Sequence, residues 1–345
     1  MSHWTEGCDR ADLRVRRRAG ATAGRLNTVA TRRPVDASAQ GRHVPLDYLH
    51  SAACEGRSLQ TGGDMRGRIL VALLLALTLM LLAAAPAAAE SEDHKGPLLA
   101  LGDSVAFGYN PLLSFANAIN FVGYPEIVAR RLELKDVNSS CPGETTGSFI
   151  SSTAADNGCR DYRVAYPLHV GYSTTQLAFA ISYLRTHHHV SLVTIDIGAN
   201  DVFVLQKQCN MVPTCINAGL PTVLATIRAN LEFIFDQIRN AADYRGRLVS
   251  LTYYSLSYDQ PSAAATEALN QPIIEATRAF HGILASGFDA FKTAALAAGG
   301  SSCAAGLLIV LPTGGCDVHP TPKGRDLLAQ AILSSLHRGG VQDQG

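Results

Sequence analysis

The residue types that suggest chemistry are a serine after an apolar run and a histidine near the C-terminus. Ser104 ends the stretch Leu98-Leu-Ala-Leu-Gly-Asp-Ser104, and His319 lies in Asp317-Val-His-Pro-Thr-Pro-Lys-Gly324. A serine hydroxyl is a poor nucleophile until a base takes its proton and donors stabilise the oxyanion that follows. The pair therefore predicts acyl transfer only if suitable donors accompany it.

Two further stretches contain such donors. Gly143, in Cys141-Pro-Gly-Glu-Thr-Thr-Gly147, has an N–H that could point at an oxyanion, and Asn200, in Asp196-Ile-Gly-Ala-Asn-Asp201, ends another apolar run with an amide. Each residue also has a plainer interpretation, because Asn200 could form an Asx turn that caps the next segment. His319 could likewise be structural. The four residues together favour the catalytic interpretation.

Ser, Gly, Asn and His in this order resemble the four blocks of the SGNH/GDSL hydrolase family. The resemblance covers residues 97–336 and implies that Ser104 is the nucleophile and His319 the general base. It also implies that Gly143 and Asn200 complete the oxyanion hole with the Ser104 N–H. Two departures stand out: Val105 replaces the usual leucine, and Asp317 lies two residues before the histidine, where the family's acid lies three before.

The acid that orients His319 is therefore the open question of the site. Cys316 occupies the third position before the histidine and cannot supply a carboxylate. Either Asp317 reaches the ring through a tightened turn, or a backbone carbonyl of residues 311–315 accepts the ring proton and Ser104 works with His319 as a dyad. We favour Asp317, because a carboxylate also stabilises the imidazolium formed during attack.

The elements that must position these residues are strands alternating with helices. Apolar runs predict strands at residues 98–101, 135–138, 190–197, 247–254 and 306–310. Helical spacing or capping residues predict helices at 124–134, 173–185, 221–242, 263–298 with breaks, and 321–336. This alternation predicts an α/β fold, a three-layer α/β/α sandwich with a mostly parallel sheet of about five strands. The resemblance implies a flavodoxin-like sheet, with its chemistry at the carboxyl edge.

The N-terminal part has the pattern of a targeting segment. Residues 65–89 combine a short basic start, an apolar run and an alanine-rich end, which predicts a secretory signal peptide. An uncleaved membrane anchor is the alternative, since about 20 apolar residues can span a bilayer. We expect residues 1–64 to be a non-native or disordered extension, 90–96 a linker and 97–338 the hydrolase domain. We expect a secreted protein, or with the alternative a membrane-anchored one.

The net charge of zero is the sum of a basic N-terminal part and an acidic remainder. Residues 1–89 carry 12 Lys+Arg against 7 Asp+Glu, whereas residues 90–345 carry 17 against 22. The second part is mildly acidic, which argues against nucleic acid as a partner. Because no Cys-x-x-Cys pair occurs and three adjacent histidines cannot converge on one ion, we expect no metal site. We expect no organic cofactor and no stable protein partner, and a monomer.

Six of the eight cysteines follow the predicted signal peptide, which is typical of disulfides formed in an oxidising compartment. Six cysteines allow 15 pairings. Closing the shortest loops costs the least chain entropy and predicts Cys141 with Cys159, Cys209 with Cys215, and Cys303 with Cys316.

These features lead us to expect a secreted serine esterase or lipase that acts on a lipid, a short-chain ester or an acylated glycan. Tyr253, Tyr254 and Tyr258 could line an acyl pocket or simply pack in the core. A polysaccharide O-acetyl esterase is the alternative enzyme. A non-catalytic surface binding module is the alternative outside enzymes.

Overall fold

The computed structural model describes residues 95–342. The predicted extension at 1–64, the predicted signal peptide at 65–89 and most of the predicted linker lie outside the described residues. No helix within residues 95–342 is both long and apolar enough to span a bilayer.

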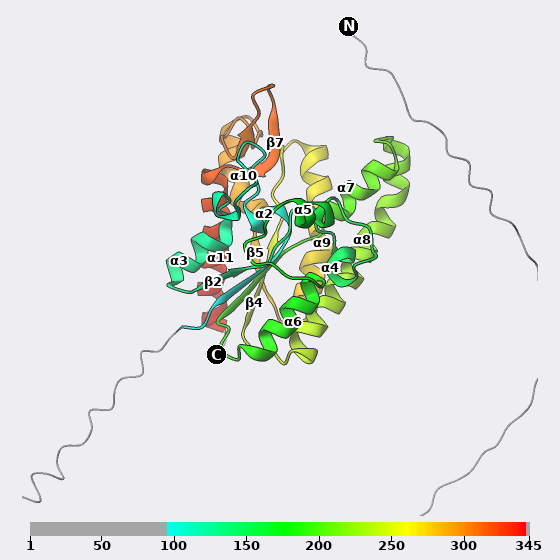
Figure 1. The fold of residues 1–345 in the computed structure, drawn as a ribbon. Coiled ribbons are helices and arrows are strands. Elements are labelled where there is room, and N and C mark those ends of the chain that lie inside the picture. Colours follow the sequence, from blue (N-terminus) through cyan, green and yellow to red (C-terminus); the bar gives the residue numbers. More distant parts are fainter. Residues whose placement is uncertain (1–94, 343–345) are drawn as a thin grey trace, which may run out of the picture. The chain divides into compact units, whose positions relative to one another are not determined.

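One parallel sheet of five strands forms the centre of the described chain, with the strand order β2-β1-β3-β4-β5 (Figure 1). Every residue of β1 and β3 is buried, as expected of strands covered on both faces. The strands are β1 (Leu98–Gly102), β2 (Asp136–Asn138), β3 (Leu192–Asp196), β4 (Arg247–Thr252) and β5 (Ile283–Ser286).

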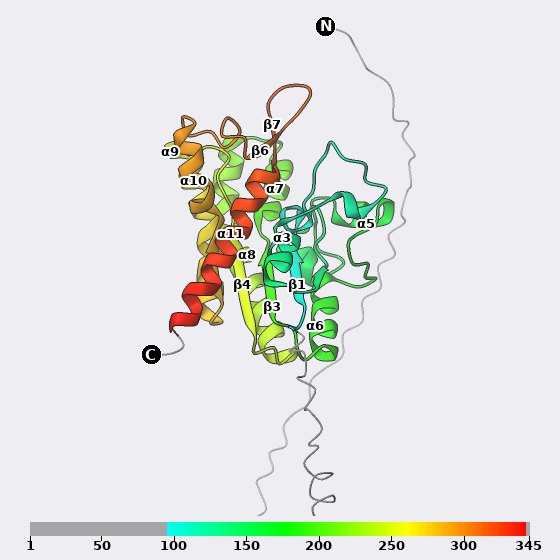
Figure 2. The ribbon, with the colours of Figure 1, turned by 90° about the vertical axis from the view of Figure 1, so that its left-hand side faces the viewer.

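Helices cover both faces of this sheet (Figures 1 and 2). One layer contains α3 (Tyr124–Leu132), α10 (Gly287–Ala297) and α11 (Pro322–Gln342). The other contains α6 (Gln176–Thr186), α8 (Pro213–Asp236), its π-helical end η2 (Gln237–Ala241) and α9 (Gln260–Ala279). The predicted three-layer α/β/α sandwich and its parallel sheet are therefore confirmed.

The sheet has five strands, as predicted, but one of them is a different segment from the one predicted. β5 lies between Gly282 and Gly287, inside the 263–298 segment that was predicted as a helix with breaks. Its four residues are Ile-Leu-Ala-Ser, and the leucine and alanine among them have little preference for a strand. They are extended because they pair in register with β4.

The predicted strand at 306–310 is outside this sheet. It forms β6 (Leu308–Val310), which pairs antiparallel with β7 (Cys316–Pro320), a segment in which no strand was predicted. Two helix starts also differ from prediction. Thr175 caps α6, and α8 begins at Pro213 with Pro221 inside it rather than at its start.

The short elements lie around the carboxyl ends of the strands. They are α2 (Ser104–Phe107), η1 (Ala118–Asn120), α4 (Thr146–Ile150), α5 (Cys159–Ala165) and α7 (Ala199–Gln208). The strand order changes direction between β1 and β3, and an open α/β sheet binds its ligands at such a switch point. Ser104 begins α2 just after β1, and Asn200 lies in the first turn of α7, the helix that follows β3.

Candidate active site

The serine and the histidine, 215 residues apart in the chain, meet at the carboxyl edge of β1. His319 Nε2 lies 2.8 Å from Ser104 Oγ, within hydrogen-bond distance. The chain reaches Ser104 through Gly102, whose φ is +134° and where a Cβ would lie 2.2 Å from the carbonyl oxygen of Asp196. Glycine therefore lets β1 pass close to β3 as it delivers the serine.

Asp317 reaches the ring of His319, although it lies only two residues before it. Its Oδ1 accepts hydrogen bonds from His319 Nδ1 and, at 3.0 Å, from the His319 backbone N–H. Both residues lie on β7, where residues two apart project from the same face. Burial opposes the charged carboxyl, but the hydrogen bond and charge of His319 outweigh it and lower the pKa of Asp317. Cys316, the third residue back, is in a disulfide with Cys303.

Three donors lie around the serine. Ser104 is the first residue of α2, so its N–H has no acceptor within the helix. Gly143 has φ +83°, and Asn157 donates its backbone N–H to the Gly143 carbonyl at 2.8 Å, which holds this loop. Asn200 is buried and orients its amide by accepting from the Asn157 side chain at 2.7 Å. Gly143 and Asn200 both line the same cavity as Ser104.

The Asn200 amide is held by a residue that the sequence analysis did not single out. Asp103 is buried and accepts from Asn200 Nδ2 at 3.1 Å and from the Tyr253 hydroxyl at 2.6 Å. Only one of the two Nδ2 hydrogens is used in this way, which leaves the other for a ligand. Burial raises the pKa of Asp103. Burial, with the charge of Asp103, raises the pKa of Asp196 well above its ordinary value.

The cavity beside Ser104 and His319 has a volume of about 400 Å³. The Tyr109 ring lies 4.8 Å from the His319 ring between centroids. Tyr253, Tyr254 and Tyr258, which could line an acyl pocket or pack in the core, do not line this cavity. The Tyr253 hydroxyl donates to Asp103, and the Tyr254 hydroxyl donates to the Val318 carbonyl at 2.6 Å. The residues lining the cavity are Ser104, Tyr109, Pro142, Gly143, Asn157, Gly158, Tyr162, Asn200, Phe203, Val318 and His319.

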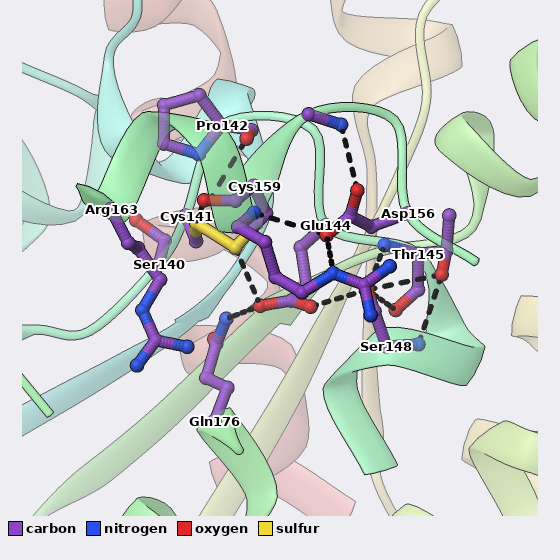
Figure 3. The surroundings of a disulfide bond; sticks show 12 residues. Ser140, Cys141, Pro142, Glu144, Thr145, Ser148, Asp156, Cys159, Arg163 and Gln176 are labelled. Atoms are coloured by element: carbon purple, nitrogen blue, oxygen red, sulfur yellow. Dashed lines mark hydrogen bonds and ion pairs between the residues drawn. A yellow bond between two sulfur atoms is a disulfide. The ribbon is translucent and has the colours of Figure 1, made fainter. Parts of the chain in front are cut away.

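Three disulfides brace the loops of this edge, in the pairs that the shortest-loop argument predicts. The Cys141–Cys159 bond joins the segment that carries Gly143 to the start of α5 (Figure 3). The Cys209–Cys215 bond closes the turn between α7 and α8, and the Cys303–Cys316 bond holds the start of β7.

Beside the first disulfide lies a buried carboxyl, Glu144 (Figure 3). It accepts hydrogen bonds from the Ser148 hydroxyl and, at 3.2 Å, from Gln176 Nε2. Gln176 is also fully buried, and it bonds both the N–H and the carbonyl of Gly102, at 2.6 and 3.0 Å. Gln176 therefore links Gly102, at the end of β1, to Glu144, the residue after Gly143. Burial raises the pKa of Glu144 to about 7.

Because this pKa is raised in the folded state, we expect Glu144 to stabilise the fold at acid pH and to lose that contribution as pH rises. This stabilisation is fully present below pH 4.5, the ordinary pKa of a glutamate, and disappears as the pH rises to about 7. Its size is on the order of 3 kcal/mol. The free energy of unfolding, measured with urea, should fall less between pH 5 and pH 8 in Glu144→Gln than in the native chain. Equal losses in the two proteins would contradict this assignment.

The class of protein is a carboxylic ester hydrolase built on a three-layer α/β/α sandwich. The chain belongs to the GDSL-like Lipase/Acylhydrolase family, whose model matches residues 100–327. This match confirms the resemblance drawn from the four sequence blocks. It spans β1 to the first turns of α11 and so contains all four of the block residues Ser104, Gly143, Asn200 and His319.

Solved structures with a similar chain are distant in sequence. Axe2, an acetylxylan esterase from Geobacillus stearothermophilus, is 17% identical, with a TM-score of 0.44 over 70% of this chain and 95% of that chain. LAE5, described as an alpha/beta hydrolase enzyme from the metagenome of Lake Arreo, Spain, is 18% identical, with a TM-score of 0.42 over 70% and 94%. No curated protein matches the chain. The family assignment rests on the match to residues 100–327.

Proposed function

We propose that this protein is a secreted serine esterase that works through an acyl-enzyme. The observation that carries the proposal is the chain of contacts from Asp317 through His319 to Ser104, beside a cavity that Gly143 and Asn200 also line. The family supports ester hydrolysis in general.

In the proposed mechanism, His319 Nε2 takes the proton of Ser104 Oγ as this oxygen attacks the ester carbonyl carbon. Asp317 accepts the Nδ1–H and stabilises the imidazolium. The Ser104 N–H, the Gly143 N–H and Asn200 Nδ2 donate to the oxyanion of the tetrahedral intermediate. The imidazolium then protonates the leaving alcohol. Water, activated by His319, releases the acid and restores the serine.

Export is the proposed fate of the chain, with residues 65–89 as signal peptide and 97–338 as the hydrolase domain. Three disulfides within the described residues support it, because disulfides persist mainly in oxidising compartments.

A panel of p-nitrophenyl esters of increasing acyl length, beside an acetylated glycan, tests the substrate class. We expect hydrolysis of the simple esters, and tolerance of acyl chains longer than acetyl, because Tyr109, Tyr162 and Phe203 line the cavity. Acetate release from the glycan, with little activity on longer esters, would instead favour the polysaccharide O-acetyl esterase. No turnover of any ester by the folded protein would contradict the proposed function.

A further inference from the structure

The segment that follows Ser104 is unusual in charge and exposure. No Asp, Glu, Lys or Arg occurs between Asp103 and Glu126. The loop is nevertheless at the surface, and it places the side chains of Leu112, Leu113, Ile119 and Val122 in solvent, with Leu112 50% and Ile119 76% exposed. Val164 and Tyr166, at the end of α5, are exposed as well. We call these six side chains the apolar rim.

The loop that carries most of the rim packs around three aromatic rings of its own. Tyr109, Phe115 and Phe121 stack with centroid distances of 5.5 to 6.2 Å. Asn120 Nδ2 donates to the Ser114 carbonyl at 2.9 Å, which closes the loop on itself. The loop therefore has an aromatic core of its own and still exposes apolar side chains on its outer side.

The same aromatic base connects the rim to the candidate active site. Tyr109 lines the cavity and lies 4.8 Å from the His319 ring. Phe115 lies 5.5 Å from Tyr109 and 5.2 Å from Tyr166, which belongs to the rim. Figure 2 shows the loop and α5 next to each other, standing out from the body of the domain. An apolar path thus runs from the outer surface to the reacting groups.

We infer that the apolar rim inserts into a neutral lipid interface and delivers the ester from that interface to Ser104. The inference rests on the proposed function and names its substrate as an aggregated, uncharged lipid ester. Exposed apolar patches mark interaction sites, and insertion of such side chains strengthens binding to a lipid surface.

The charges nearby favour a neutral surface over an anionic one. The arginines of α5 already have partners: Arg160 pairs with Asp156 at 3.0 Å, and Arg163 donates to the Thr174 carbonyl at 3.1 Å. Residues 90–345 carry 17 Lys+Arg against 22 Asp+Glu, so an anionic membrane would repel the domain. A specific protein partner would engage about 20–30 residues, whereas the rim consists of six side chains on two short segments.

Two paired measurements on the folded protein test the inference. The first is flotation with phosphatidylcholine vesicles, and the second is hydrolysis of emulsified tributyrin compared with dissolved p-nitrophenyl acetate. The double variant Leu112→Ser/Ile119→Ser should lose about tenfold or more in vesicle affinity and in tributyrin hydrolysis. Its activity on the dissolved ester should stay within about twofold, since neither residue lines the cavity.

Leu296→Ser is the matched control, because Leu296 is 54% exposed on α10, which follows the edge strand β5, whereas the rim lies after β1 and at the end of α5. It should behave as the native chain in both measurements. Equal vesicle binding by the native chain and the double variant would overturn the inference. So would a lack of flotation together with a concentration-dependent dimer that the double variant abolishes, because the rim would then bind a second copy. Turnover of neither ester by a native chain that still floats would contradict the proposed function and leave the lipid surface supported.

Discussion

Ser104→Ala should reduce kcat for ester hydrolysis by about 10⁴-fold or more while the protein stays folded. The Ser104 hydroxyl is the group that His319 Nε2 contacts at 2.8 Å, and in the proposed mechanism it alone receives the acyl group. Alanine removes that oxygen and little else, since Ser104 sits at the start of a short helix whose cap is Asp103. Initial rates with p-nitrophenyl acetate and a thermal unfolding curve give the two readouts.

A covalent probe makes this test independent of turnover. A fluorophosphonate should add one mass increment to the native chain and none to Ser104→Ala, whereas the exposed Ser114→Ala control should label as the native chain does. Labelling of the Ser104→Ala variant at another residue, or retention of more than a few per cent of the native rate, would show that the nucleophile lies elsewhere.

Asp317→Asn should lower kcat by about 10³ to 10⁴ with a small change in KM. The asparagine side chain can occupy the same place, but its amide can donate to His319 Nδ1 and so favour the tautomer that cannot accept the Ser104 proton. The carboxylate also stabilises the imidazolium in the transition state, and an amide does so less. The measurement is kcat and KM on one soluble ester, for the native chain and the variant.

The matched control is Asp326→Asn, an exposed acid on α11, which should keep the native kcat. A loss below about tenfold in Asp317→Asn, with His319→Ala still inactive, would mean that a backbone carbonyl orients the ring. The contacts of Asp317 Oδ1 with both His319 Nδ1 and the His319 backbone N–H argue for the carboxylate.

The sequence singled out the residues of the candidate site partly through local signals and partly through the family resemblance. Ser104 and Asn200 come two and four residues after the ends of the apolar strands β1 and β3, and parallel strands place their carboxyl ends along one edge. The family blocks added Gly143 and His319. Asp103 and Gln176 were not found, because nothing in their neighbourhood along the chain shows that one holds the Asn200 amide and the other bonds Gly102. These contacts join residues separated by 97 and 74 positions.

The sequence by itself determined the fold class, four of the five strands of the sheet and the residues available for chemistry, since apolar periodicity and turn residues are local properties. Only the tertiary structure decided that Ile283–Ser286 is the fifth strand of the sheet, because its extended state depends on pairing with β4. The tertiary structure also decided that the Asp317 side chain points towards His319. Pairing with β6 makes β7 a strand, and a strand turns a spacing of two residues into two side chains on the same face.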